Sequence, residues 1–199
     1  MPNPSMIPDR HLDLGCGTLP RNPYGRSSLY GIDLRSLPAS AGITLAVADL
    51  CTEPVPFPDN FFGSISAFDY LEHMPRVLLN PSGSQVVFPF INLMSEIHRV
   101  LSPGGRFYAL TPCYPSPAAF QDPTHVNIIT PETHAYFCGD IPTASIYGFS
   151  GRFKLVRAEW AVHEDSRSAR PLTWVQKARR LKKSIKGQLS HFLWELEKY

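Results

Sequence analysis

The sequence lacks a long hydrophobic run. Its longest stretch without a charged residue, residues 77–95, contains Asn, Pro, Ser, Gly and Gln, which excludes a membrane-spanning helix there. Residues 1–10 are polar and rich in proline, so we expect no signal peptide. Cysteine is scarce: four cysteines stand far apart without a C-x-x-C pair, which disfavours a zinc ribbon and a disulfide framework. We therefore expect a soluble, cytoplasmic protein.

Charge is also scarce, at 18% of 199 residues, and it is distributed unevenly. Residues 1–166 hold 10 Lys and Arg against 15 Asp and Glu, whereas residues 167–199 hold 9 against 2. The hydrophobic share of 43% is typical of a globular chain of one domain. We expect a domain over residues 1–166, followed by a basic tail over residues 167–199.

Short apolar runs bounded by turn residues predict buried strands. Five such runs cover residues 11–14, 29–33, 43–48, 61–68 and 106–111. Between the last two, apolar residues recur at helical spacing from Phe90 to Leu101, and Pro89 suits a first helical turn. Strand, helix and strand in succession predict a mostly parallel, doubly wound, Rossmann-like α/β sheet with helices on both faces.

The remaining chain gives weaker predictions. Residues 130–132 (TPE) are typical of a helix start, and residues 153–162 alternate as a last strand would. From residue 170 the apolar positions keep near-helical spacing as far as Leu196, with cations between them. We expect a basic amphipathic helix, bent near Gly187. It could pack against the domain, bind an anionic membrane surface or meet RNA or another phosphate-bearing partner.

A glycine turn follows the first predicted strand, in LDLGCG (residues 12–17). Glycines at such a turn allow the backbone to approach a ligand closely. A dinucleotide fingerprint would need a third glycine at position 20, which is Pro20, and this counts against NAD or FAD. Asp33 and Asp49 end the next two strands, where a ligand at the carboxyl edge of the sheet would lie.

These motifs together resemble the class I S-adenosylmethionine-dependent methyltransferases, in particular a bacterial small-molecule or glycan group similar to methyltransferase type 11. The resemblance is carried by LDLGCG, YGIDL, ADL, PFPDNFFGSISAFDYLEHM and HRVLSPGGRFYALTP, within residues 11–112. It implies a Rossmann-like fold, S-adenosyl-L-methionine as cofactor and methyl transfer as the activity.

The resemblance also implies residue roles around the cofactor. Gly15 and Gly17 would pass its methionine end, Asp13 would orient the glycine turn, and Phe68 would lie beside the cofactor at the end of the fourth strand.

At the nucleoside end, the resemblance implies that Asp33 binds the ribose, with Leu34 against the adenine. Asp49 would accept from the adenine amine, and the backbone of Leu50 would meet the ring edge.

The chain departs from the family pattern around the cofactor. Leu19 stands where a third glycine is usual, and prolines in residues 18–29 predict a short or irregular link between the first two strands. Only ten residues precede the first strand, where family members carry covering helices. A lid would then come from residues 112–131, from the basic tail or from a partner subunit, for example in a homodimer, or the site would have no lid.

Three residues are candidates for catalysis. His125, in the long loop after the fifth strand, is the expected general base because histidine is the side chain that ordinarily titrates near neutral pH. His73 and Asp69 follow the fourth strand. These residues together with Asp122 could instead bind a divalent metal, but their spacing matches no metal signature, so we expect no metal.

We therefore expect methyl transfer to a hydroxyl or amine of a small molecule or glycan. One alternative is a non-catalytic protein that keeps the fold, and another is a methyltransferase that reaches RNA through its tail. A nucleic-acid acceptor is disfavoured because Asp69-Tyr-Leu-Glu72 stands where base amino-methyltransferases carry an Asn/Asp-Pro-Pro-Tyr/Phe motif.

Overall fold

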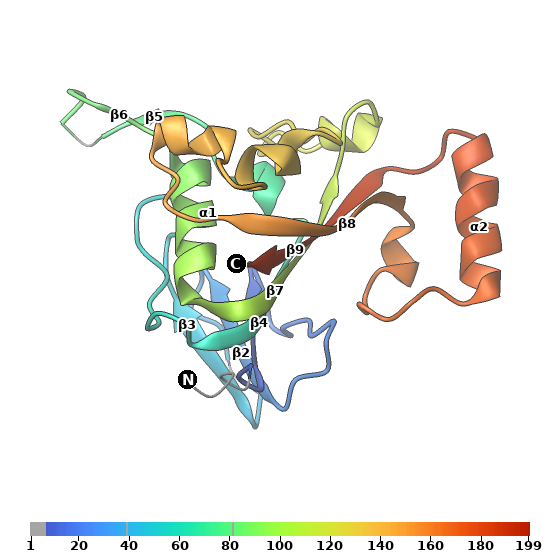
Figure 1. The fold of residues 1–199 in the computed structure, drawn as a ribbon, viewed down its shortest axis with the longest axis horizontal. Helices are drawn as coiled ribbons and strands as arrows, with labels where there is room; N and C mark the ends of the chain where they lie inside the picture. The colour runs from blue at the N-terminus through green and yellow to red at the C-terminus, as the bar shows by residue number, and fades with distance from the viewer. Residues whose placement is uncertain (1–6, 39, 81) are drawn as a thin grey trace.

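A seven-stranded sheet organises the molecule in the computed structural model, which describes residues 7–38, 40–80 and 82–199. The strand order is β3-β2-β1-β4-β7-β9-β8 (Figure 1). The strands span Arg10–Leu14 (β1), Ser28–Asp33 (β2), Ile43–Val47 (β3), Phe62–Phe68 (β4), Leu101–Pro112 (β7), Phe153–Ala161 (β8) and His191–Lys198 (β9). Strands β3, β2, β1, β4 and β7 are parallel, and β9 runs antiparallel between β7 and β8. The mostly parallel, Rossmann-like sheet is thus confirmed.

The link between β1 and β2 is short and irregular, as the prolines in residues 18–29 predict. Residues 15–27, between β1 and β2, form turns and irregular backbone without an α-helix. Pro20 and Cys16 lie against Gly31 on β2, where an added Cβ would come within 2.8 Å of Pro20 Cγ and 2.5 Å of Cys16 Sγ. The glycine that permits this close approach is therefore on the strand rather than in the turn.

Helix α1, Pro89–Val100, covers one face of the sheet. Pro89 stands in its first turn, and its buried side chains join the main core as expected. Those side chains are Phe90, Leu93, Met94, Ile97 and Val100. Each large apolar side chain buried in this way contributes about 1.5–3 kcal/mol, so the helix is held by its packing.

The opposite face carries a second apolar cluster, formed by Phe68, Tyr108, Leu110, Ala161 and Leu193. It is partly covered by Tyr24 and Ala169, which come from irregular segments.

The last part of the predicted helical tail is a strand, so the expectation of a helix as far as Leu196 is wrong. Helix α2 spans Trp174–Ile185, and Gly187 follows it with φ of +62°. Residues 191–198 form β9 between β7 and the edge strand β8, and Trp194 is fully buried. A short apolar run with both faces covered cannot be told from a helix by spacing alone.

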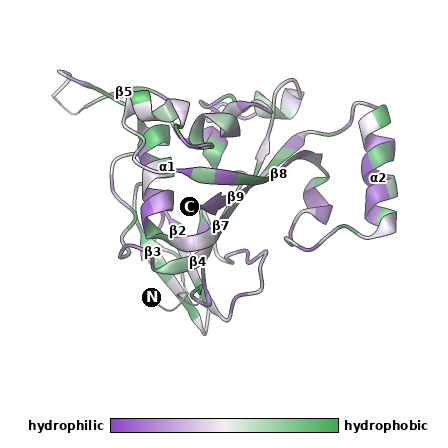
Figure 2. Cartoon of the chain, viewed as in Figure 1, coloured by the Kyte–Doolittle hydropathy of each residue, from purple (hydrophilic) through white to green (hydrophobic). Residues whose placement is uncertain are grey.

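Helix α2 is held to the domain by ion pairs, not by its apolar side. Arg179 pairs with Asp165, and Arg180 pairs with Glu159 on β8. No residue of α2 is buried, and Trp174 is 80% exposed. The helix stands away from the sheet with hydrophobic and hydrophilic residues along it (Figures 1 and 2). These ion pairs agree with the interpretation in which the helix lies against the domain with its cations facing solvent or the acidic domain, although no α2 side chain is buried.

Smaller elements connect these parts. Strands β5 (Leu78–Leu79) and β6 (Val86–Val87) form a hairpin, and the 3-10 helices are η1 (Leu71–His73), η2 (Pro117–Ala119), η3 (Thr133–Phe137), η4 (Thr143–Tyr147) and η5 (His163–Asp165). The helix expected to start at residues 130–132 is the short η3. Among the described residues, neither α-helix has the length and apolar character needed to cross a bilayer.

Candidate functional site

The candidate residues follow the carboxyl ends of β1, β2, β3 and β4, and these ends lie at one edge because the four strands are parallel. Ligands of open α/β sheets bind outside this edge. The glycine turn follows β1, Asp33 ends β2, Asp49 lies two residues after β3, and Asp69 follows β4. The fold thus brings together what the sequence places in four separate segments.

The glycine turn has two different geometric requirements. Gly15 has φ of +62°, and a Cβ there would come within 2.4 Å of Tyr70 Cδ2. Gly17 has φ of +59°, and a Cβ there would meet nothing within 4 Å. Gly15 therefore permits close packing of Tyr70, while Gly17 leaves open space. The Gly17 N–H donates to Asp33 Oδ2 at 3.0 Å, which joins the turn to the end of β2.

Asp13 is fully buried and holds the chain after the turn. Its carboxylate accepts from the backbone N–H of Arg21 at 2.8 Å and from Arg21 Nε at 3.2 Å. Arg21 Nη2 in turn donates to the Gly15 carbonyl at 3.2 Å. The guanidinium also lies 4.8 Å from the ring centre of Phe68, which is buried in the second cluster. Sequence reasoning missed Arg21.

A buried hydrogen-bond chain supports Asp13 from behind. Ser66 Oγ donates to Asp13 Oδ1 at 2.6 Å, so the 2.8 Å contact between His11 and Ser66 requires His11 Nε2 to donate. His11 Nδ1 then accepts from Ser64 Oγ at 2.8 Å. Burial lowers the pKa of His11 to about 3, which keeps the ring neutral in this chain.

Asp33 and Asp49 are both engaged within the protein. Arg35 donates to Asp33 from its backbone and from Nε, at 3.0 and 2.9 Å. Partial burial opposes ionisation, but these bonds and the one from Gly17 lower the pKa of Asp33. The Asp49 carboxylate accepts from the Cys51 N–H at 3.0 Å and closes its own turn. Between them, Leu34 is 69% exposed.

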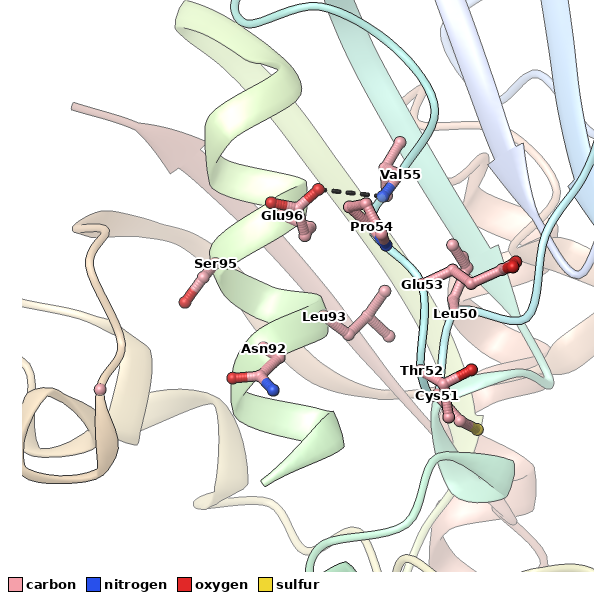
Figure 3. A pocket seen from close by; sticks show the side chains of 11 residues that line it. Leu50, Cys51, Thr52, Glu53, Pro54, Val55, Asn92, Leu93, Ser95 and Glu96 are labelled. Carbon is pink, nitrogen blue, oxygen red and sulfur yellow. Dashed lines mark hydrogen bonds between the residues drawn. The ribbon is translucent and has the colours of Figure 1, made fainter. Parts of the chain in front are cut away.

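A cavity of about 300 Å³ lies between residues 50–55 and α1 (Figure 3). Leu50 and Cys51 line it at one side, and Glu96 accepts from the Val55 N–H at 2.9 Å, drawn dashed in the figure. Leu50 itself is buried. This cavity adjoins the end of β3, whereas the glycine turn and the candidate catalytic histidines are not among its lining residues.

His73 and His125 come together with Glu72, which sequence reasoning missed although it precedes His73. We call Glu72, His73 and His125 the Glu72 cluster. The two imidazole rings are 4.8 Å apart, and His125 Nε2 lies 4.0 Å from Glu72 Oε1. The loop that carries His125 is tied to η1, because Asn127 donates to the carbonyls of Glu72 and Leu71 at 2.9 and 3.0 Å.

The hydrogen bonds of this cluster fix both imidazole tautomers. His125 Nδ1 faces the Ala119 carbonyl at 3.3 Å, and a carbonyl only accepts, so Nδ1 carries the proton. Thr124 Oγ1 donates to Asp122 at 2.7 Å and therefore accepts from His73 Nδ1 at 2.9 Å. In both neutral rings the lone pair remains on Nε2.

Glu72 is 1% exposed, and only one of its carboxylate oxygens has a donor. Thr111 donates to Oε2 at 2.9 Å, while Oε1 has no hydrogen-bond partner within the described part of the chain. Burial raises the pKa of Glu72 to about 7.

Asp69 forms a different group with two histidines that the sequence did not single out. We call Asp69, His163 and His191 the Asp69 cluster. His163 Nε2 and His191 Nε2 each lie 3.0 Å from one oxygen of the Asp69 carboxylate. Ser190 Oγ lies 2.8 Å from His191 Nδ1. The signal for His163 was its place directly after a predicted strand.

Each cluster offers one carboxylate and two imidazoles within 4.8 Å of one another, a set that could hold a metal ion. The four residues that sequence reasoning considered as alternative ligands are separated. His73 and His125 lie in the Glu72 cluster, Asp69 lies in the other, and the Asp122 carboxylate is held by Thr124.

Comparisons with known proteins agree with this architecture. A family model described as a methyltransferase domain matches residues 12–109. A search of curated proteins finds no match. Similar solved structures include a putative methyltransferase of Haloferax volcanii in complex with a methyltransferase activator, which is 14% identical with a TM-score of 0.58. The match covers 98% of this chain and 84% of that one.

Two further solved structures are similar to the chain. An S-adenosylmethionine-dependent methyltransferase from Mesorhizobium loti is 18% identical with a TM-score of 0.54, over 95% of this chain and 90% of that one. The geranyl diphosphate C-methyltransferase from Streptomyces coelicolor is 15% identical with a TM-score of 0.53, over 97% and 72%. At these identities the likeness concerns the fold.

The matched residues 12–109 contain the glycine turn, both strand-end acids and helix α1, and the whole sheet has the fold of solved methyltransferases. Residues 12–109 of the chain thus match a methyltransferase domain, and the sheet has the fold of class I S-adenosylmethionine-dependent methyltransferases.

Proposed function

We propose that the chain methylates a hydroxyl group of a small molecule or glycan, with an amine as the alternative acceptor. When bound, S-adenosylmethionine supplies an electrophilic methyl group on a sulfonium centre. The protein's part is to hold the acceptor atom in line with that methyl group, and positioning of this kind provides much of the acceleration. A hydroxyl acceptor also needs its proton removed.

The glycine turn fits the methionine end of this cofactor. Gly17 leaves open space where any other residue would place a Cβ, and Gly15 keeps the backbone close to Tyr70. We assign to Asp13 the task of holding the turn, which its hydrogen bonds to Arg21 support. Phe68 supports the turn indirectly, because its ring packs against the Arg21 guanidinium.

The nucleoside end is assigned to the ends of β2 and β3. Asp33 would accept from the ribose hydroxyls in place of Arg35, whose side chain is 69% exposed and free to move away. The exposed Leu34 offers an apolar surface to adenine. Asp49 would accept from the adenine amine while the Leu50 backbone meets the ring edge.

The observation that carries the choice of a hydroxyl is the Nε2 lone pair of His125. No hydrogen bond from the described residues reaches Nε2, and Nδ1–H is already given to the Ala119 carbonyl. The acceptor hydroxyl would donate to Nε2 and lose its proton there as its oxygen bonds the methyl group. Glu72 Oε1, 4.0 Å away, is a second acceptor, so the pair suits neighbouring hydroxyls such as those of a sugar.

The test is a radiolabelled methyl-transfer assay on a panel of sugars, small alcohols and amines. His125→Ala should lower the rate on a hydroxyl acceptor by about 10²–10⁴-fold, the usual contribution of a positioned base. Gln121→Ala, an exposed change in the same loop, is the matched control and should keep the wild-type rate. Full activity of a folded His125→Ala variant would remove the role of His125, and transfer to amines alone would remove the hydroxyl acceptor.

A further inference from the structure

Three acceptor groups of the Glu72 cluster converge without a donor between them. The tautomers leave a lone pair on Nε2 of both His73 and His125. Glu72 Oε1 is buried and has no donor within the described chain. A buried acceptor without a partner is destabilising, so such an arrangement favours a positively charged or proton-bearing ligand.

The outer contacts of the three side chains are those of a metal site. A histidine that binds a metal usually donates its other N–H to a carboxylate, a backbone carbonyl or water. A carboxylate that binds a metal is itself hydrogen-bonded. Here His125 gives Nδ1–H to the Ala119 carbonyl, His73 gives Nδ1–H to Thr124, and Glu72 accepts from Thr111 through Oε2. Each ligand is thus oriented by an outer contact, and one ligand atom from each of the three residues lies within 4.8 Å of the others.

The Asp69 cluster shows what a satisfied group of the same composition looks like. Both oxygens of Asp69 lie at hydrogen-bond distance from an imidazole nitrogen, 3.0 Å in each case. In the Glu72 cluster the corresponding distance between Glu72 Oε1 and His125 Nε2 is 4.0 Å. That gap is too long for a hydrogen bond and is about half an ångström wider than the separation of two ligands bound at about 2.0–2.2 Å to one ion at a tetrahedral angle, so a small side-chain movement would admit the ion.

We propose that Glu72, His73 and His125 bind one divalent transition-metal ion, of the class of Zn²⁺, Mn²⁺, Fe²⁺ or Co²⁺. Two imidazoles and one carboxylate suit these ions and leave coordination positions open, whereas Mg²⁺ prefers oxygen ligands alone. The site would take an oxygen of the proposed acceptor, most readily from a molecule with neighbouring hydroxyls.

This inference rests on the proposed function only for the identity of the acceptor, and metal binding is independent of it. With the ion bound, His125 Nε2 is a ligand instead of a base. A hydroxyl bound to the ion would lose its proton to solvent water before its oxygen takes the methyl group from the sulfonium centre, and His125 remains necessary for transfer in both cases.

The test titrates the chelator-treated full chain with Co²⁺, Zn²⁺, Mn²⁺ or Mg²⁺ by calorimetry, and records the visible absorption of the Co²⁺ form. We expect one Co²⁺ or Zn²⁺ per chain, a Co²⁺ absorption band and much weaker Mg²⁺ binding. His125→Asn should weaken Co²⁺ binding by more than about 100-fold, since loss of outer contacts alone costs about 10–100-fold. His191→Asn, in the Asp69 cluster, is the matched control and should bind as the wild type does.

Absence of stoichiometric Co²⁺ and Zn²⁺ binding would overturn the proposal, as would binding that is lost in His191→Asn and kept in His125→Asn. Melting curves of each variant exclude unfolding, and Glu72→Gln is the second variant if His125→Asn fails to fold. Methyl transfer to a hydroxyl at an undiminished rate in excess chelator, with no metal bound, would overturn the contact between the metal and the acceptor and leave the proposed function. Stoichiometric metal binding by a protein that methylates no hydroxyl would overturn the proposed function and leave the metal site.

Discussion

The Glu72 cluster and the Asp69 cluster contain the same kinds of groups but distribute their hydrogen bonds differently. In the Asp69 cluster both carboxylate oxygens meet an imidazole nitrogen at 3.0 Å. In the Glu72 cluster the imidazole N–H groups point outward, and a buried carboxylate oxygen has no donor among the described residues. The kinds of side chain in a cluster therefore do not by themselves identify a ligand site. Unsatisfied acceptors mark it, because satisfied ones already have their stabilising partners.

The largest expected difference between the clusters is in stability. Asp69→Asn leaves two imidazoles facing an amide, and hydrogen bonds to a charged group are worth about 1.5–3 kcal/mol each when buried. Because Asp69 is partly exposed, we expect a loss of about 2 kcal/mol in the free energy of unfolding. Glu72→Gln keeps an acceptor for Thr111 and should change stability by less than about 1 kcal/mol.

Urea denaturation of both variants in excess chelator measures this contrast. Equal losses for Asp69→Asn and Glu72→Gln would show that the two clusters are alike and would break the comparison.

A smaller expected effect is the pH dependence of the Asp69 cluster. Burial favours the neutral acid, but the hydrogen bonds from His163 and His191 outweigh it and hold the pKa of Asp69 well below 3.8. That contribution is present above pH 3.8 and is lost as the pH falls through the folded-state pKa. The hydrogen bond to Asp69 raises the pKa of His163 above 6.5. Its contribution is complete below pH 6.5 and is lost as the pH rises through the raised pKa.

The stability difference between wild type and Asp69→Asn should therefore be largest between about pH 4 and 6.5. It should shrink by about 1 kcal/mol at higher pH, with the size limited by partial exposure. Denaturation across the pH range measures it, and a difference that grows above neutrality would contradict the assigned ion pairs.

Much of the fold follows from the sequence because its signals are local. The five parallel strands are short apolar runs between turn residues, and Pro89 marks the first turn of α1. The sequence did not predict strand β9, because residues 189, 192 and 196 also fit a helical repeat. In the structure Phe192, Trp194 and Leu196 alternate along the strand and join the core. Its identity as a strand depends on β7 and β8, which are distant in sequence.

The candidate site likewise has residues that local motifs predict and residues that only the folded chain brings together. His73, His125 and the strand-end acids were predicted from motifs that lie within single segments. Glu72 was missed because an acid after a strand has no visible partner until residue 125 folds against it. His163 and His191 lie 94 and 122 residues from Asp69, and only the pairing of β8 with β9 brings them to it.

The measurement that tests the central claim most directly is a calorimetric titration with S-adenosylhomocysteine, the demethylated product, on wild type and Asp33→Ala. The glycine turn and Asp33 are held together by the Gly17 N–H, so we expect wild-type binding in the micromolar range. Asp33→Ala should remove that binding while the variant remains folded. No binding to folded wild-type protein, or unchanged binding to Asp33→Ala, would contradict the assignment of the cofactor to this edge of the sheet.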